Sequence, residues 1–186
     1  MSDSSIEPIS SIETIYTLDD KIIKLITLFN LYGNTNYFGE HVSKTEHMIQ
    51  CAIEAQNNNE PEFIVLACLL HDIGHLLGND DMNGLGVKDH DLLAYYYLNE
   101  LGMNQRVCYL VKKHVDAKRY LVTIDSMNYH NLSYASKKTL EYQGNLMSDN
   151  ELIEMEQDDE FLNILKVRKY DDMGKEKNKE IPNIET

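Results

Sequence analysis

Two histidines and an aspartate stand at the end of the most apolar run of the chain. Residues 63 to 70 are all apolar and lead into His71-Asp72, and His75 follows one helical turn beyond His71. A carboxylate that emerges from a buried helix is costly unless it is paired or bound to a metal. Adjacent imidazole and carboxylate groups suit a two-metal centre, in which the imidazole binds one ion and the carboxylate bridges both. The run therefore predicts a metal site around Asp72.

Further imidazole and carboxylate groups lie where neighbouring helices could bring them to the same site. His47 precedes the apolar run, His90 and His114 follow it, and Asp171 comes after the last apolar segment. Such a donor set suits iron or manganese better than the thiolate sites that bind zinc. We expect the metal ligands to be His47, His71, Asp72, His90, His114 and Asp171. The remaining histidines, His41 and His130, are not expected to bind metal.

The elements that would position these residues are all helical. Apolar residues recur at helical spacing, and we find no alternation typical of strands. The pattern predicts an all-α, single-domain protein. The expected helices cover residues 18–31, 42–57, 61–70, 87–101, 104–118 and 133–142, with one or two more between 149 and 171. Residues 119–131 are expected to be irregular. A flexible arm, 1–17, precedes the domain, 18–173, and a polar tail, 174–186, is expected to fray.

The composition of the chain limits the classes of partner that it can bind. The formal net charge of −14 argues against nucleic acid, because phosphate backbones need a basic surface. No stretch approaches 18 apolar residues, so we expect no membrane contact. Cys51, Cys68 and Cys108 lack C-x-x-C spacing and are interpreted as reduced thiols of a cytoplasmic protein. A monomer or a weak homo-oligomer that acts on a small molecule fits these features.

The framework of His47, His71-Asp72 and Asp171 resembles the HD-domain superfamily, whose members are mostly metal-dependent phosphohydrolases. A narrower resemblance extends from about residue 37 to 175. The specific segments are 37–40, 86–90, 114–122, 132–144 and 168–171. They are similar to the HD-domain mixed-valence di-iron oxygenases of the PhnZ type, which include 2-amino-1-hydroxyethylphosphonate dioxygenases. The function implied by this resemblance is phosphonate catabolism, in which O2 is used to cleave a carbon–phosphorus (C–P) bond and release glycine and phosphate.

The resemblance also implies roles for individual residues. Two iron ions, Fe(II) and Fe(III), would be the cofactors. His47, His71, Asp72 and Asp171 would hold one iron, and Asp72 would bridge to the other, held by His90 and His114. Tyr37 would close the open iron position until substrate displaces it. Glu40 would pair with the substrate amine. The phosphonate would be bound by His75, Lys118, Ser136, Thr139 and Arg168. The residues expected to be catalytic are Tyr37, Glu40, His75 and Lys118.

Three other functions remain open at this point. The same framework could act on the trimethylated analogue, 1-hydroxy-2-(trimethylammonio)ethylphosphonate, whose quaternary ammonium would favour aromatic packing. It could instead be a phosphohydrolase that activates water against a phosphate ester. It could also be a degenerate HD module that only binds a ligand, although every expected ligand residue is present.

Overall fold

The computed structural model describes residues 16–36, 41–79 and 82–185. Within that part of the chain the secondary structure is helical and no β-strand occurs, which confirms the predicted all-α class. The elements are α1 (Leu18–Tyr32), α2 (Lys44–Asn57), α3 (Glu62–Leu70), a short 3₁₀ helix η1 (Ile73–Leu76), α4 (His90–Glu100), α5 (Gln105–Ile124), α6 (Ser126–Asn131), α7 (Tyr134–Tyr142), α8 (Asp149–Glu156) and α9 (Phe161–Met173).

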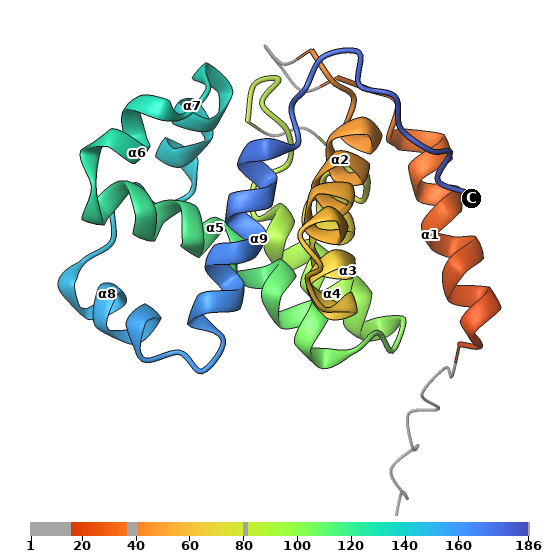
Figure 1. Ribbon diagram of the computed structural model, residues 1–186, viewed down its shortest axis with the longest axis horizontal. Helices are drawn as coiled ribbons and strands as arrows, with labels where there is room; N and C mark the ends of the chain where they lie inside the picture. Colours follow the sequence, from red (N-terminus) through yellow and green to blue (C-terminus); the bar gives the residue numbers. More distant parts are fainter. Residues whose placement is uncertain (1–15, 37–40, 80–81, 186) are drawn as a thin grey trace, which may run out of the picture.

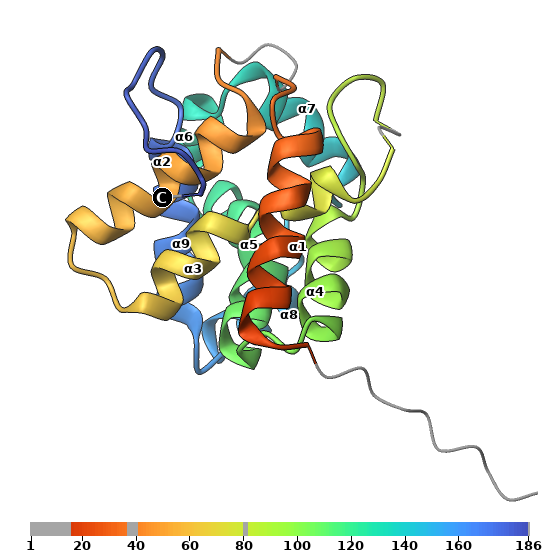
Figure 2. The same cartoon turned by 90° about the vertical axis from the view of Figure 1, so that its right-hand side faces the viewer.

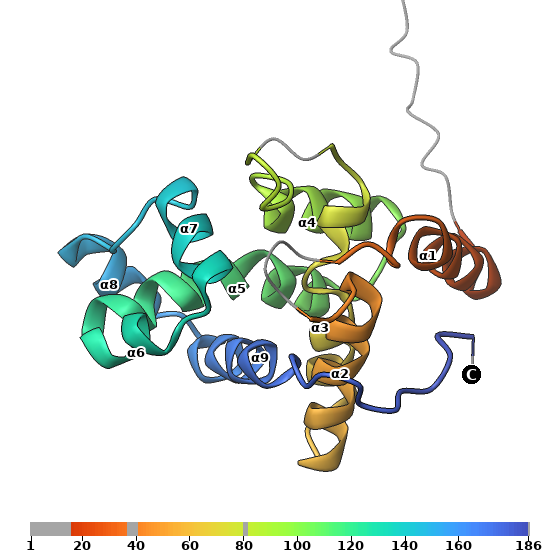
Figure 3. The same cartoon turned by 90° about the horizontal axis from the view of Figure 1, so that it is seen from above.

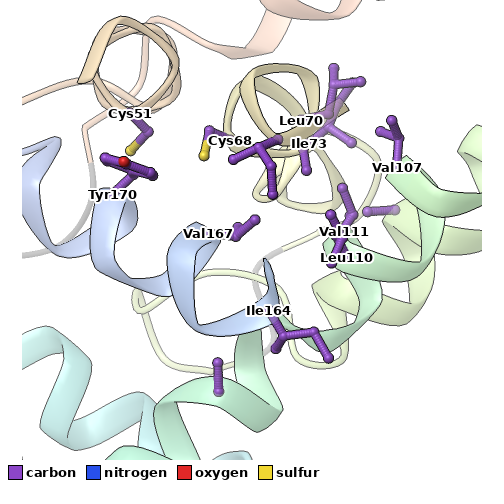
Figure 4. Packing of buried hydrophobic residues seen from close by; sticks show 14 of the residues in the cluster. Cys51, Cys68, Leu70, Ile73, Val107, Leu110, Val111, Ile164, Val167 and Tyr170 are labelled. Carbon is purple, nitrogen blue, oxygen red and sulfur yellow. The ribbon is translucent and has the colours of Figure 1, made fainter. Parts of the chain in front are cut away.

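The core lies where α2, α3, α5 and α9 meet. Helix α5 packs against α3, α4 and α9, and α2 packs against α3 and α9. Cys51 of α2, Cys68 of α3 and Tyr170 of α9 are all at most 1% exposed and gather around one another (Figure 4). Burial of such apolar surface contributes about 25 cal/mol per Å². The helices that carry the predicted ligands are thus held together by the main core.

Helices α6, α7 and α8 form a separate layer on the far side of α5 and α9 from α1 (Figures 1 and 3). This layer contributes little to the core. Helix α6 buries none of its residues, and α7 buries only Leu140. Helix α7 is therefore held beside α5 more by polar contacts than by apolar packing.

Helix α5 is longer than the sequence pattern predicts. It runs to Ile124, and α6 follows at once, so the prediction that residues 119–131 are irregular is wrong. Val122, Thr123 and Ile124 are β-branched and have modest helix propensity. Burial of Tyr120 and Val122 outweighs that propensity. By contrast α4 begins at His90, three residues later than expected, because Asp89 before it adopts a left-handed backbone conformation (φ 54°).

The C-terminal segment is not frayed, and that expectation is corrected. Residues 174–185 leave α9, cross α2 and end beside α1 (Figures 1 and 2). Lys179 pairs with Glu54 of α2, and the Asn30 side chain of α1 donates to Glu185. Polar composition predicted disorder, but the polar groups find partners on the two helices beneath.

Candidate metal centre

Four histidine rings and two carboxylates converge at the centre of the fold. Their side chains come from α2, the end of α3, the start of α4, α5 and the last turns of α9, and each residue is at most 7% exposed. A capping box between Ser43 and Glu46 starts α2 just before His47. Gly74 lets η1 approach α4, since a Cβ there would overlap the His90 carbonyl oxygen. The predicted ligands His47, His71, Asp72, His90, His114 and Asp171 are thus brought together.

Asp72 lies between two groups of ligands and presents one carboxylate oxygen to each. Its Oδ2 is 3.4 Å from His71 Nε2 and 3.7 Å from His47 Nε2. Its Oδ1 is 3.4 Å from His90 Nε2 and 3.4 Å from His114 Nε2. Such an arrangement would allow Asp72 to bridge two cations.

Asp171 completes the first group. Its Oδ1 is 3.3 Å from His47 Nε2 and 3.8 Å from His71 Nε2. The first group therefore contains His47, His71, Asp72 and Asp171, and the second contains Asp72, His90 and His114. We call these the α2–α9 half and the α4–α5 half of the centre. The division matches the ligand sets that the sequence resemblance implies.

The four histidines share a hydrogen-bonding pattern that suits metal ligands. Each ring uses Nδ1–H to donate to a backbone carbonyl, at 2.7–3.1 Å. The Nε2 atoms then face each other, at 3.2 Å between His47 and His71 and 3.1 Å between His90 and His114. Two neutral imidazoles arranged this way bring lone pair against lone pair, which only a shared proton or cation relieves. Histidine ligands typically have the other ring N–H fixed in this way.

The electrostatics also favour bound cations. Burial opposes the charge on Asp72, but His71 and the other histidines hold the pKa of that carboxyl well below its usual range. Burial lowers the pKa of His71, yet the Asp72 carboxylate outweighs it and raises that pKa to about 9. The two carboxylates therefore draw positive charge into a buried site. Metal ions in place of the proton on His71 would satisfy both the carboxylates and the imidazoles.

His75 differs from the other four histidines. Its Nδ1 accepts a hydrogen bond from the Val87 N–H at 3.0 Å, so the proton of the neutral ring is on Nε2. The ring stacks on His90 with centroids 3.9 Å apart, and burial holds its pKa well below the usual range. A protonated Nε2 cannot bind metal but can donate a hydrogen bond. The structure thus places His75 beside the centre as a donor.

A cavity of about 70 Å³ opens onto the predicted ligands His47, Asp72, His90, His114 and Asp171. Lys118, Ser136, Thr139 and Arg168 line the same cavity. Lys118 Nζ donates to Thr139 Oγ1 at 3.0 Å, and the Arg168 guanidinium donates to Asp171 and Asp172. Burial, with the nearby Arg168 charge, lowers the pKa of Lys118 to about 7. Two buried cations and two hydroxyls that line one cavity can form a site for an anion.

Two predicted residues, Tyr37 and Glu40, lie outside the described residues. Two further polar residues, Gln143 and Lys175, line the cavity without having been predicted. The Gln143 side-chain oxygen is buried without a hydrogen-bond partner among the residues that the structure describes. An amide on the helix of Ser136 and Thr139, one turn further on, could have been noticed from spacing alone. Lys175 could not have been predicted in this way, because it belongs to the C-terminal tail, which was expected to fray.

Cys51 lies close to the α2–α9 half, with Sγ 3.8 Å from the His47 ring nitrogens. Burial and the neighbouring Asp171 charge raise its pKa well above the usual range. Cys51 is part of the hydrophobic core, and its Sγ also lies close enough to His47 and His71 for the three to hold a metal ion, although no cysteine was expected to be a ligand. His41 and His130, which were not expected to bind metal, are both exposed.

Comparison with known proteins agrees with this geometry. The HD domain family model matches residues 38–168. The chain belongs to the HD-domain family. An uncharacterised protein of Acanthamoeba polyphaga mimivirus is 43% identical over 81% of this chain and 71% of its own length.

Two relatives carry names that state an activity. A 1-hydroxy-2-(trimethylamino)ethylphosphonate dioxygenase (glycine-betaine-forming) of Leisingera caerulea is 34% identical over 83% of this chain and 80% of its own length. A hydroxymethylphosphonate dioxygenase of Gimesia maris is 31% identical over 91% of this chain and 85% of its own length. This HD-domain protein therefore groups with the phosphonate dioxygenases of its family. No helix in the described ranges is long and apolar enough to span a membrane.

Proposed function

We propose that this protein is a di-iron dioxygenase that uses O2 to cleave the C–P bond of a 1-hydroxyalkylphosphonate. The observation that carries the proposal is that the buried Lys118 and Arg168 and the half-buried Ser136 and Thr139 line one cavity together with predicted ligands of both groups. The identity with two named phosphonate dioxygenases supports the same reaction class. Phosphonate catabolism would be its role.

The donor set fits two iron ions. His47, His71 and Asp171 would hold one, His90 and His114 the other, and Asp72 would bridge them. Imidazole and carboxylate donors suit iron. When bound, an Fe(II)/Fe(III) pair would provide the redox chemistry and the open coordination position that reaction with O2 needs.

The residues of the chain would bind and orient the phosphonate. Lys118 and Arg168 neutralise its charge, and the carboxylates of Asp171 and Asp172 hold the guanidinium in place. Ser136 and Thr139 offer hydroxyls from one side of α7. The His75 Nε2–H would donate to a phosphonate oxygen close to the ligands. Substrate would thus be held with its hydroxyl-bearing carbon toward the metal centre.

The first substrate we propose is 2-amino-1-hydroxyethylphosphonate, with Glu40 pairing with its amine and Tyr37 occupying the open iron position beforehand. In the substrates that the two relatives' names give, a trimethylammoniomethyl group or a hydrogen atom replaces the aminomethyl group. A substrate panel should therefore contain all three phosphonates. For the general member, the alcohol R–CH(OH)–PO3H2 and O2 give R–COOH and H3PO4, which balances every atom.

The experiment uses iron-loaded full-length protein and follows O2 uptake and phosphate release in the same sample for each phosphonate. We expect both signals with at least one of the three, and the largest kcat/KM with the free amine. Phosphate release without O2 uptake would overturn the oxygenase proposal. Hydrolysis of nucleotide esters with manganese, together with no turnover of the phosphonates, would support the phosphohydrolase alternative.

We further propose that the protein works in the cytoplasm as a monomer or weak homo-oligomer, with the phosphonate and O2 as its partners. The three cysteines, Cys51, Cys68 and Cys108, are buried free thiols, which supports a reducing compartment.

A further inference from the structure

One of the four histidines depends on a distant part of the chain for its orientation. His71, His90 and His114 each donate Nδ1–H to the backbone carbonyl three residues earlier. His47 instead donates to the carbonyl of Gly174, 127 residues away, at 2.9 Å. The carbonyl that accepts its Nδ1–H therefore belongs to the C-terminal segment, whereas on its own helix the ring contacts Cys51 Sγ at 3.8 Å.

Gln50 anchors that segment to α2. Its side-chain amide donates to the Glu176 carbonyl at 3.0 Å and accepts from the Glu176 N–H at 2.9 Å. Gln50 is 1% exposed and lies one helical turn beyond His47. A paired amide–backbone contact of this kind fixes both the position and the register of residues 174–176.

The segment also packs closely on α2. A Cβ at residue 174 would overlap Cys51 Sγ and would lie 2.9 Å from the His47 carbonyl oxygen. Gly174 is therefore the residue type that allows this approach. It lies three residues after Asp171, so the end of α9 provides a ligand and, one turn later, the carbonyl that orients another.

We propose that the docking of residues 174–176 on α2 positions His47 for metal binding, and that Gln50 is the positioning residue. Without the Gly174 carbonyl, the His47 ring would lose the partner that fixes its rotation and its tautomer. Its Nε2 lone pair would then no longer be aimed at the ion of the α2–α9 half. The α4–α5 half would keep its own local carbonyls. The inference rests on the proposed metal centre.

The test compares Gln50→Met, which keeps much of the volume and removes the amide, with Glu54→Gln. The Glu54 variant breaks the Lys179 ion pair further along the same segment and serves as the matched control. Each full-length variant is titrated with Fe(II) anaerobically against a chelator. We expect Gln50→Met to weaken one of the two iron sites by about 10- to 100-fold and leave the other unchanged. Glu54→Gln should bind both irons as the wild type does.

A second readout needs no metal. In metal-free protein, ¹⁵N NMR should show a protected Nδ1–H for His47, assigned by its loss in His47→Asn, and Gln50→Met should lose this signal alone. A wild-type-like signal and iron titration in Gln50→Met would overturn the inference, as would equal weakening of both sites. If wild-type protein bound no iron, the proposed function would fail, while the NMR comparison would still decide whether residues 174–176 hold the ring.

Gly174→Ala provides an independent variant. Its methyl group would push the segment off α2 by contact with Cys51, so we expect the same loss of one iron site and of the same ring signal. If Gly174→Ala kept both iron sites and the His47 ring signal while protease or hydrogen-exchange data showed residues 174–185 displaced, the positioning role would be wrong.

Discussion

The two halves of the metal centre are built in different ways. In the α4–α5 half, His90 and His114 are oriented by carbonyls of Val87 and Val111, each three residues back. In the α2–α9 half, His47 relies on Gly174, and Asp171 comes from the far end of the chain. The α4–α5 half therefore takes its ligands, Asp72 included, from residues 72–114. The other requires the chain to close from α2 to α9 and beyond.

The largest effect should come from removing the one residue common to both halves. Asp72→Ala takes away the carboxylate that faces His71 with one oxygen and His90 with the other. We expect both irons to be lost and turnover to fall below detection, as measured by iron content and O2 uptake. Retention of two irons in this variant would break the comparison, because Asp72 would not be the bridge.

A pair of single-ligand variants should separate the halves. His47→Asn should remove the ion of the α2–α9 half, and His90→Asn the ion of the α4–α5 half. Each variant should keep about one iron per chain, and their metal-bound spectra should differ from each other. Loss of both irons in either variant would show that the halves cannot be filled independently.

Lys118→Met should change neither half but should weaken substrate binding. Lys118 is 4% exposed and faces the cavity with Thr139 as partner. Loss of one buried charge partner costs roughly 2 kcal/mol or more, so KM should rise by about 30-fold or more at unchanged iron content. A change confined to kcat would place Lys118 in the chemical step and away from phosphonate binding.

The smallest effect should be a pH dependence carried by the same lysine. With a pKa of about 7 in the folded protein, Lys118 loses its proton as pH rises through 7, and KM for the phosphonate should rise. Lys118→Arg should flatten this profile. The stability of the metal-free protein should change in the favourable direction as pH rises. An unfolded lysine keeps its proton up to about pH 10.5, whereas the folded Lys118 loses it near 7, so this group makes folding more favourable as pH rises from 7 to 10.5. Thermal melts over that range measure it.

Much of this centre could be predicted from the sequence because the ligands follow strong local patterns. An apolar run that ends in His71-Asp72 has few interpretations, and the helix periodicity placed α1, α2, α3 and α7 within a few residues. Helix α5 was predicted too short because β-branched residues hide a helix that tertiary burial sustains.

The features that could not be predicted are a backbone hydrogen-bond acceptor and contacts between residues far apart in the sequence. The Gly174 carbonyl carries no side-chain signature, and the polar composition of residues 174–185 concealed their docking on α2. Lys175 lines the cavity only because that segment docks. The hydrogen bonds between Gln50 and Glu176 join residues that are 126 positions apart in the sequence, so no pattern of local spacing reveals them.

The most direct test of the central claim is the fate of the two oxygen atoms of ¹⁸O2 during turnover by iron-loaded protein. The atom balance of C–P cleavage adds two oxygens, one to the carboxylic acid and one to phosphate. We predict one O2 consumed for each phosphate released, with ¹⁸O in both products. Phosphate that forms without O2 uptake and carries its new oxygen from water would contradict the account and identify a hydrolase.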